Sequence, residues 1–518
     1  MAENRGIVFL VGAGPGDPGL LTRRGEQLLK EAEVVVYDHL ANPRLLDLVP
    51  TEAIRVSAGK SVGHCTMTQD LINAALVDHA RAGRRVVRLK GGDPYIFGRG
   101  SEEEEYLRAA SIPCQVIPGV TAAVGVSAYA GISLTHRESA SAVAFVTGHG
   151  HADPNRSGGG KDLDWNALAA FPGTLVIYMG VTRLESLCQT LIERGKDRRT
   201  PAAMIGSGTL ARQRTVEGTL ETLPERVKTD GLRPPGLLVI GKVVNRRPVR
   251  SWFEELPLFG QRIVVTRPRD EAVRAASSLE ALGAEALIAP TVEILPLESY
   301  AQLDQTIDHL SRYHWAVFTS SNGVQAFFDR LEAVGHDLRA VGHLKLAAIG
   351  PATADALRRY HLRADLIPRS FRSEDLAEAL VKEVKGQRVL LLRADRGRTI
   401  LQEELGQVAQ VDQVALYRNA DVASIPEEIV RRVEEGSIDW ITLTSSAITN
   451  RLHSLLGEQG RSRIGREIKL ASLSPVTSAT ATQLGWKVAA EAKEYTWAGL
   501  VEALVEASQP SIAEEQPA

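Results

Sequence analysis

Cysteine is scarce in this chain of 518 residues. The three cysteines, Cys65, Cys114 and Cys188, stand far apart in the first half, and no C-x-x-C pair occurs. Such spacing suggests neither a disulfide framework nor a cysteine zinc site. We therefore expect no structural disulfide and no bound metal.

Long apolar runs and an excess of basic residues are also missing. No apolar run reaches 18 residues, and only five apolar residues follow "MAENRG", which is too short for a signal peptide. Lys and Arg total 60 against 63 Asp and Glu, so the net charge of −3 does not indicate nucleic-acid binding. These features predict a cytoplasmic protein that binds neither membrane nor nucleic acid.

The length and composition predict several globular domains. With 44% hydrophobic and 24% charged residues the composition is ordinary, and 518 residues are too many for one core. The stretch "VVNRRPVRSWFEELPLFGQR", residues 243 to 262, has no clear periodicity and marks a boundary near 250 to 260. On each side short β-branched runs alternate with helical segments, which is typical of α/β architecture.

A glycine-rich turn, "FLVGAGPGDPGLLT" at residues 9 to 22, predicts strand, loop and helix. The dinucleotide pattern G-x-G-x-x-G requires a third glycine where Asp17 stands, and Pro15 removes an amide that could bind an anion. No Gly-Lys-Ser/Thr follows, so a P-loop is excluded. Asp38, however, ends the next apolar strand, where a ribose-binding acid would sit. At this point a dinucleotide site, a purely structural turn and another ligand all remain open.

A second candidate loop lies in "VVRLKGGDPYIFGRGSEEEEYL", residues 86 to 107. An apolar strand ends at Lys90 and a Gly-Gly-Asp-Pro turn follows. Ligands of open α/β sheets gather beyond the carboxyl ends of strands, so this loop joins the first one there. The run Glu102 to Glu105 predicts a solvated helix start, where carboxylates suit the helix dipole.

The second half contains an internal repeat. "WAVFTSSNGV" from Trp315 matches "WITLTSSAIT" from Trp440, and "LAAIGPATADAL" from Leu346 matches "LASLSPVTSATA" from Leu470. A weaker similarity relates "IVVTRPRD" (263 to 270) to "VLLLRADR" (389 to 396). Ordered matches at nearly constant spacing indicate a duplicated module, so we expect two like α/β domains with a cleft between them.

Residues 6 to 246 resemble the uroporphyrinogen-III C-methyltransferases of the tetrapyrrole methylase family, because "GAGPGDPGLLT", "KGGDPYIFGRG", "PGVTAA" and "LTHR" occur in family order. The resemblance implies two α/β subdomains, a homodimer formed through this half, and S-adenosylmethionine as methyl donor. This donor is a cationic sulfonium without phosphate, which is consistent with Pro15 and Asp17 in the first loop.

The same resemblance assigns site residues. Asp38 is implied as proton acceptor and Lys60 as proton donor, whereas the residues alone would favour a helix-capping aspartate and a surface lysine. Uroporphyrinogen carries eight carboxylates, for which Lys90, Arg99 and Arg137 are the basic candidates. The residues implied to hold the donor are Pro15, Gly91, Gly92, Asp93, Ile96, Thr121, Ala122, Met179 and Gly208.

Residues 262 to 505 resemble uroporphyrinogen-III synthases through "VTRP", "FTSSNGV", "AIGPATADAL", "DWITLTSS" and "EYTWAGLVEAL". That family closes linear hydroxymethylbilane with inversion of the last ring and loss of water, a reaction that needs no strong nucleophile. Tyr417 resembles a tyrosine proposed to assist water loss. Hydroxyls and helix N-termini suit carboxylate binding, although each candidate alone would more often be a helix cap. The binding candidates are Thr319, Ser320, Ser321, Asn322, Thr353, Thr444, Ser445, Ser446 and Thr477.

Together the two resemblances predict a fold of two α/β halves: a methylase at 1–250, a linker at 251–261, a synthase at 262–505 and a disordered tail at 506–518. Within the synthase, 262–297 plus 418–505 should form one domain and 298–417 the other. The expected activity is formation of uroporphyrinogen III and its double methylation to precorrin-2, toward sirohaem or cobalamin. The implied partners are small tetrapyrroles, with hydroxymethylbilane synthase upstream. The alternatives are an NAD-dependent dehydrogenase, or a methyltransferase fused to a non-catalytic tetrapyrrole-binding module.

Overall fold

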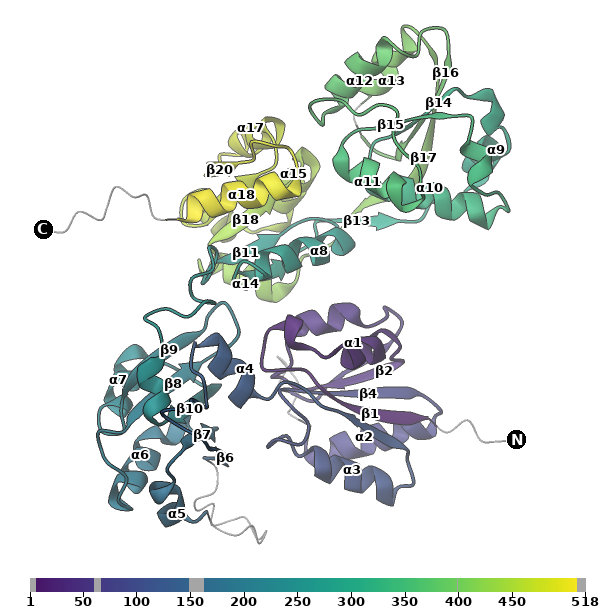
Figure 1. The fold of residues 1–518 in the computed structure, drawn as a ribbon. Helices are drawn as coiled ribbons and strands as arrows, with labels where there is room; N and C mark the ends of the chain where they lie inside the picture. Colours follow the sequence, from purple (N-terminus) through teal and green to yellow (C-terminus); the bar gives the residue numbers. More distant parts are fainter. Residues whose placement is uncertain (1–5, 60–66, 149–162, 398, 510–518) are drawn as a thin grey trace, which may run out of the picture. The chain divides into compact units, whose positions relative to one another are not determined.

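The computed structural model describes residues 6–59, 67–148, 163–397 and 399–509. The chain forms two compact units, Met1–Gln261 with Glu280–Glu285, and Arg262–Leu279 with Ala286–Ala518. Each unit contains two five-stranded sheets with helices packed on them (Figure 1). Over these ranges no helix combines the length and the apolar character needed to cross a bilayer.

The first sheet of unit 1 is parallel, with strand order β3-β2-β4-β1-β5. Phe9 and Val11 pack with Leu28 of α1 on one face, whereas Val8 and Leu10 pack with helices α2 and α3 on the other. This alternation follows from the two-residue period of a strand. Because the strands are parallel, the turns that follow β1, β2, β4 and β5 leave at one edge. The elements are β1 (Ile7–Gly12), η1 (Pro18–Leu20), α1 (Arg23–Lys30), β2 (Val34–Tyr37), η2 (Pro43–Leu48), β3 (Ile54–Ser57), α2 (Gln69–Arg81), β4 (Arg85–Lys90), α3 (Gly100–Ala109) and β5 (Cys114–Ile117).

The second sheet of unit 1 is mixed, with order β6-β7-β10-β8-β9. Its β6–β7 pair is parallel, and the pairs β7–β10, β10–β8 and β8–β9 are antiparallel. Leu175 and Ile177 face a core with α5, α6 and α7, and Val176 faces a core with α4. The elements are α4 (Ala122–Tyr129), β6 (Val143–Thr147), α5 (Trp165–Ala170), β7 (Thr174–Tyr178), η3 (Val181–Arg183), α6 (Leu184–Glu193), β8 (Pro201–Gly206), β9 (Arg214–Thr219), α7 (Leu223–Asp230), β10 (Gly236–Ile240) and η4 (Lys242–Arg246).

The stretch expected as a linker packs against unit 1. Phe253 is 5% exposed, and its ring centroid lies 4.8 Å from that of Tyr129 in α4. Arg247 Nη2 and Glu254 Oε2 form an ion pair at 2.5 Å. Residues 252–254 are therefore part of the packed structure of the N-terminal unit, and any division of the chain has to follow them.

The first sheet of unit 2 has the order β12-β11-β18-β19-β20. The pairs β11–β18, β18–β19 and β19–β20 are parallel. Ile441 and Leu470 contribute to a core with α14, α15 and α17. The elements are β11 (Arg262–Val265), α8 (Arg269–Glu280), β12 (Glu285–Ile288), α14 (Glu427–Glu434), β18 (Trp440–Leu443), α15 (Ser446–Leu455), α16 (Glu458–Arg463), β19 (Lys469–Ser472), α17 (Pro475–Gln483), β20 (Ala490–Glu491) and α18 (Trp497–Ser508).

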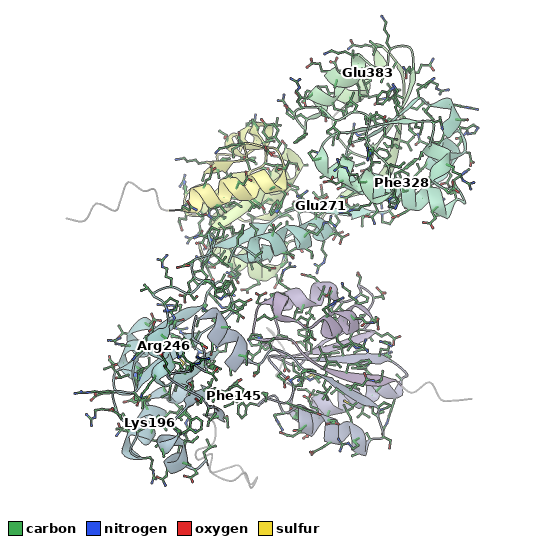
Figure 2. The ribbon with its side chains drawn as sticks, in the orientation of Figure 1. Phe145, Lys196, Arg246, Glu271, Phe328 and Glu383 are labelled. Atoms are coloured by element: carbon green, nitrogen blue, oxygen red, sulfur yellow. The ribbon has the colours of Figure 1, made fainter. Side chains whose placement is uncertain are left out.

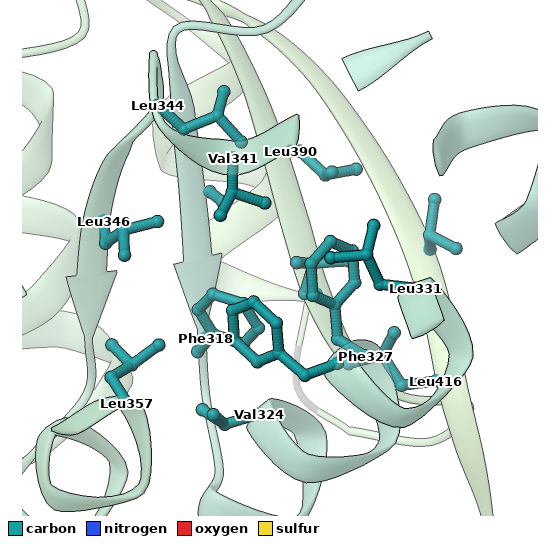
Figure 3. Packing of buried hydrophobic residues seen from close by; sticks show 14 of the residues in the cluster. Phe318, Val324, Phe327, Leu331, Val341, Leu344, Leu346, Leu357, Leu390 and Leu416 are labelled. Carbon is teal, nitrogen blue, oxygen red and sulfur yellow. The ribbon is translucent and has the colours of Figure 1, made fainter. Parts of the chain in front are cut away.

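The second sheet of unit 2 has the order β13-β17-β16-β14-β15. Only the edge strand β13 is antiparallel to its neighbour, β17. Phe318 of β14 and Phe327 and Phe328 of α10 form the centre of one core (Figure 3). Trp315 and Val317 face the opposite core, with α12 and α13. The elements are β13 (Val292–Leu295), α9 (Ala301–Asp308), η5 (Leu310–Arg312), β14 (Trp315–Phe318), α10 (Ser321–Ala333), η6 (Leu338–Val341), β15 (Lys345–Ala348), α11 (Pro351–Arg359), α12 (Ser373–Val381), β16 (Arg388–Ala394), α13 (Ile400–Gly406) and β17 (Gln410–Asp421).

The two copies of the internal repeat place their strands at equivalent positions. The strands of one copy, however, do not all belong to one sheet. The first copy places β11 and β12 in one sheet and β14 and β15 in the other, and the second copy places β16 and β17 beside β14 and β18 to β20 beside β11. Equivalent contacts recur: Lys345 Nζ lies 5.3 Å from the Trp315 ring centroid, and Lys469 Nζ lies 5.3 Å from that of Trp440. Each sheet is thus built from both copies, a refinement of the expectation of two like domains.

The C-terminal helix is longer than expected. Helix α18 ends at Ser508, three residues into the stretch 506–518 that was predicted to be disordered. The remaining part of that stretch, 510–518, lies outside the described residues.

Candidate functional site

Three turns of unit 1 meet backbone to backbone at the carboxyl edge of the parallel sheet. The amide of Gly92 donates to the carbonyl of Gly14 at 2.7 Å, and the amide of Gly14 donates back at 3.2 Å. A Cβ on Gly12 would lie 2.5 Å from the Cα of Gly119, and a Cβ on Gly119 would lie 2.3 Å from the Gly92 carbonyl oxygen. No other residue type allows this approach, so these glycines serve turn packing first.

Two carboxylates stabilise these turns. Asp17 Oδ2 accepts the hydroxyl of Tyr129 at 2.6 Å. Asp93 accepts the amide of Tyr95 at 2.8 Å through Oδ1 and the amide of Gly119 at 3.0 Å through Oδ2. Negative charge at the turns disfavours a pyrophosphate and is compatible with a cationic ligand.

A tyrosine of the second sheet contacts the start of α4. The hydroxyl of Tyr178 lies 2.6 Å from Thr121 Oγ1 and accepts the amide of Ala123 at 2.9 Å. Burial raises the pKa of Tyr178, so the phenol stays protonated. The next residue, Met179, has φ of 55° and remains 42% exposed.

The loop after β8 is also strained. Ser207 and Thr209, on either side of Gly208, have φ of 47° and 66°. A Cβ on Gly208 would lie 2.4 Å from Val126 Cγ1. Non-glycine residues with positive φ cost energy and cluster at functional sites. The backbone of this loop and that of Met179 therefore both indicate a functional site in unit 1.

The residues expected to hold the methyl donor lie on five loops that hydrogen bonds connect. The Gly14–Gly92 pair joins the loops after β1 and β4, and Asp93 joins the second of these to the loop before α4. Tyr178 joins α4 to the loop after β7, and the amide of Asp17 donates to Thr209 Oγ1 at 2.9 Å. The structure therefore brings together the loops that carry Pro15, Gly91, Gly92, Asp93, Ile96, Thr121, Ala122, Met179 and Gly208.

Large apolar side chains are exposed near these loops. Phe97 is 40% exposed and Phe145 is 37% exposed, and their ring centroids lie 4.9 and 6.2 Å from that of Tyr178. Figure 2 labels Phe145. Leu40, on the loop after β2, is 60% exposed. Exposed apolar surface of this kind suits a large flat ligand.

Asp38 follows β2 and is bound by a buried arginine. Arg88 of β4 is 2% exposed, and its Nη2 lies 2.5 Å from Asp38 Oδ1. The Arg88 Nε contacts Glu103 Oε1 at 3.2 Å, and Lys90 Nζ contacts the same oxygen at 2.9 Å. Glu103 is fully buried, so the expectation that Glu102 to Glu105 form a solvated helix start is wrong for this residue.

The basic candidates for binding substrate carboxylates separate into buried and exposed side chains. Lys90 is 2% exposed and paired with Glu103, and burial together with Arg88 lowers its pKa. Its side chain forms an ion pair inside the protein, and its assignment as a ligand of substrate carboxylates stays a prediction. Arg99 is half exposed and paired with Glu102, and Arg137 is exposed. Lys60 lies outside the described residues.

Sequence reasoning missed Arg88, Glu103 and Tyr178. A signal for Arg88 was present, because a charged residue inside the apolar strand "VVRL" requires a buried partner. Nothing in the run of four glutamates distinguishes Glu103 from its neighbours. Tyr178 stands beside Met179, but its contact with α4 joins residues far apart in the sequence.

In unit 2 the predicted hydroxyl residues lie at the starts of helices that follow parallel strands. Ser320 caps α10, with its Oγ 2.9 Å from the amide of Gly323, and Ser445 caps α15, 3.3 Å from the amide of Ile448. Ser446 Oγ accepts the hydroxyl of Thr480 at 2.8 Å. The structure thus places Thr319, Ser320, Ser321 and Asn322 after β14, and Thr444, Ser445 and Ser446 after β18.

Thr353 and Thr477 belong to the helices that follow the neighbouring strands β15 and β19. They are 3% and 2% exposed, and Thr477 Oγ1 lies 3.1 Å from Ser474 Oγ. Their side chains are therefore buried, and their assignment as ligands of a substrate stays a prediction. Ser474 caps α17, whereas the equivalent Gly350 has no side chain to cap α11.

Tyr417 lies at the end of the β16–β17 pairing, beside the start of α10. It is 8% exposed, and its hydroxyl lies 3.0 Å from Ser320 Oγ. Burial raises its pKa. Glu271 of α8 accepts the side-chain amide of Asn322 at 2.7 Å and pairs with Arg267 (Figure 2 labels Glu271). These side chains bring polar groups from both sheets of unit 2 to one place.

Comparison with known proteins identifies both halves. Residues 8–224 match the family model of Tetrapyrrole (Corrin/Porphyrin) Methylases, and residues 273–502 match that of Uroporphyrinogen-III synthase HemD. The porphyrin biosynthesis protein HemD of Ruminiclostridium josui is 34% identical over 498 residues, covering 95% of this chain and 94% of that protein. The siroheme synthase of Tolumonas auensis is 51% identical over 248 residues, covering 48% of this chain; the chain spans 51% of that protein's length.

Two solved structures are similar to separate halves. The uroporphyrin-III C-methyl transferase of Thermus thermophilus, complexed with S-adenyl homocysteine, is 40% identical, covers 46% of this chain and 99% of its own, and gives a TM-score of 0.39. A mutant uroporphyrinogen III synthase of the same organism is 16% identical, covers 48% and 98%, and gives 0.37. The near full-length relative and the two family models show that the chain belongs to the porphyrin biosynthesis proteins that join a tetrapyrrole methylase to a uroporphyrinogen-III synthase.

Proposed function

We propose that this chain catalyses two consecutive steps: closure of hydroxymethylbilane to uroporphyrinogen III, with inversion of the last ring, and transfer of two methyl groups to that product, giving precorrin-2. The observation that carries the proposal is that one chain matches the family models of both a tetrapyrrole methylase and a uroporphyrinogen-III synthase. The product of the first activity is the substrate of the second, so the pairing has a chemical reason. Precorrin-2 would then enter the sirohaem or the cobalamin branch.

The described residues of unit 1 fit S-adenosylmethionine. Its loops combine close-packed glycine turns, two carboxylates and exposed apolar side chains, and the Cβ of a residue at Gly92 would meet nothing nearer than 3.9 Å. When bound, this donor supplies a methyl group on a positively charged sulfur. Asp93 and Tyr178 would hold the turns that position it, and Met179 and Gly208 would contact it from the second sheet.

In the methylation step the residues of unit 1 would orient the macrocycle and take up a proton. A carbon–carbon bond forms between the pyrrole and the methyl group, and the carbon–sulfur bond breaks. Asp38 would then accept the proton lost from the methylated ring, because its carboxylate lies at the carboxyl edge of the sheet and is 31% exposed. Positioning should supply much of the rate, since it replaces a bimolecular encounter.

In the synthase step unit 2 would hold a reactive chain in one conformation. Tyr417 would hydrogen-bond to the departing hydroxyl while the carbon–oxygen bond breaks, and the hydroxide would take up the proton that the pyrrole N–H of the same ring gives up, so that water leaves. Its raised pKa opposes full proton donation, so it would assist by hydrogen bonding. Ser320, adjacent to it, fixes the direction of the phenol.

Incubation with hydroxymethylbilane, with and without S-adenosylmethionine, tests the proposal. We expect the type III isomer without the donor and the mass of two added methyl groups with it. Accumulation of the type I isomer alone would contradict the synthase assignment. Tight binding of NADH without binding of S-adenosylhomocysteine would contradict the methylase assignment and favour a dehydrogenase.

A further inference from the structure

A fully buried carboxylate lies behind the expected proton acceptor of unit 1. Glu103 Oε1 receives three contacts, from Arg88 Nε at 3.2 Å, Lys90 Nζ at 2.9 Å and Gln69 Nε2 at 3.0 Å. The other oxygen, Oε2, is buried and accepts no hydrogen bond from any residue that the structure describes. A buried charge is costly unless it is paired, so a carboxylate with this much burial serves a purpose that a neutral side chain would not.

The carboxylate controls the arginine that binds Asp38. Arg88 uses Nε for Glu103 and Nη2 for Asp38, so its planar guanidinium is held at two points. With Glu103 in place, the two cations Arg88 and Lys90 face the two anions Glu103 and Asp38. If Glu103 were removed, the positive charges of Lys90 and Arg88 would repel each other. Of the two anions, only Asp38 would then remain to offset this repulsion.

We propose that Glu103 is a positioning residue for methylation: it fixes the Arg88 guanidinium, and through it the direction of the Asp38 carboxylate. This inference rests on the proposed function of Asp38. Helix α3, which begins immediately after the loop bearing Gly91 to Asp93, carries Glu103 in its first turn. Movement of that loop on ligand binding would therefore reach Asp38 through the same side chains.

The direct test is Glu103→Gln, which keeps the shape and removes the charge. We expect kcat for methylation to fall about 100-fold, as for a small misplacement of a reacting group, while KM for S-adenosylmethionine changes little. Glu105→Gln, at an exposed position of the same helix, is the matched control and should behave as the native protein.

A double-mutant cycle with Arg88→Lys tests whether Glu103 acts through Arg88. The double variant should be no slower than Arg88→Lys alone, whereas additive losses would overturn the inference. The synthase activity of unit 2 reports the integrity of the rest of the chain and should stay unchanged. If Glu103→Gln destabilises unit 1, Glu103→Asp, which keeps the charge, should fold and recover most of the rate.

The outcomes separate the inference from the proposed function. A native chain that transfers no methyl group would contradict the proposed function itself. A native chain that methylates, with a folded Glu103→Gln variant of equal kcat and equal KM, would overturn the inference alone.

Discussion

Replacement of Tyr178 by Phe should loosen the expected donor site without removing any residue that contacts the donor. The hydroxyl accepts the Ala123 amide at 2.9 Å and lies 2.6 Å from Thr121 Oγ1, at the start of α4. Phe keeps the ring and its contact with Phe97, so the change isolates these two hydrogen bonds. A partly buried amide left without its acceptor costs about 1–3 kcal/mol.

The cost should appear in both stability and affinity. For a domain of this size about 1 kcal/mol lowers Tm by about 2–4 °C, so the first thermal transition should fall by several degrees. If about 1.4 kcal/mol of this loss is taken from the binding free energy of S-adenosylhomocysteine, its Kd rises about tenfold, which calorimetry measures directly. We expect kcat to fall less than the affinity, because Tyr178 touches no reacting atom in the proposed mechanism.

Tyr313→Phe is the matched control for this experiment. Its hydroxyl donates to Asp412 at 2.8 Å in unit 2, so a similar hydrogen bond is lost in the unit that does not carry the methylase loops. The control should leave S-adenosylhomocysteine binding unchanged. A Tyr178→Phe protein with native affinity and native Tm would refute the reasoning, because the two hydrogen bonds would then contribute nothing to the loop.

Four further predictions follow from the same contacts. Asp38→Asn should retain S-adenosylhomocysteine binding and lose methylation, since the amide cannot accept the proton while Arg88 keeps Glu103 as partner; unchanged turnover would remove Asp38 from the mechanism. Asp93→Ala should weaken S-adenosylhomocysteine binding about tenfold by calorimetry, because two amides lose their acceptor; native affinity would contradict that role. Tyr417→Phe should slow formation of uroporphyrinogen III by less than about a thousandfold, or about 4 kcal/mol of barrier, since its raised pKa favours hydrogen bonding over proton donation; a larger loss would show that one hydroxyl carries the chemistry. Separate proteins 1–261 and 262–518 should each fold and keep one activity, whereas 1–250, which lacks the buried Phe253, should melt at a lower temperature than 1–261; equal melting would contradict the packing of that stretch.

The strands and the glycine-rich turns of unit 1 can be predicted from the sequence, because both depend on local patterns. The strand into Gly12 and the turn after Lys90 are where the apolar runs end. The sequence does not predict which charges are buried. Glu103 and Glu105 are both glutamates of one helix, and only their position relative to the sheet makes one fully buried and the other exposed. The same reason explains why the burial of Lys90 was not predicted, since its partner Glu103 lies 13 residues away in the chain.

The duplicated half shows a different limit. Matching motifs around Trp315 and Trp440 identify equivalent strands, and both tryptophans occupy the same place beside a lysine of the next strand. The motifs do not reveal that each sheet combines strands from both copies, because strand pairing is a long-range property. Burial of Thr353 and Thr477 was also hidden, since a threonine in the first turn of a helix can face either solvent or the sheet.

The two copies of the repeat differ where the proposed reaction needs them to differ. Inversion of one terminal ring requires that the two ends of hydroxymethylbilane be held unequally. Ser474 satisfies an amide at the start of α17, whereas Gly350 leaves the first turn of α11 without a side-chain cap, so amides there remain for water or a ligand carboxylate. Tyr417 of β17 lies in the same sheet as β15, which leads into α11, and Ser320 follows β14 of that sheet. Strands from both copies of the repeat thus place the uncapped helix α11 and the hydroxyl of Tyr417 on one sheet, and this asymmetry between the two sheets of unit 2 would hold the two ends of the proposed substrate unequally.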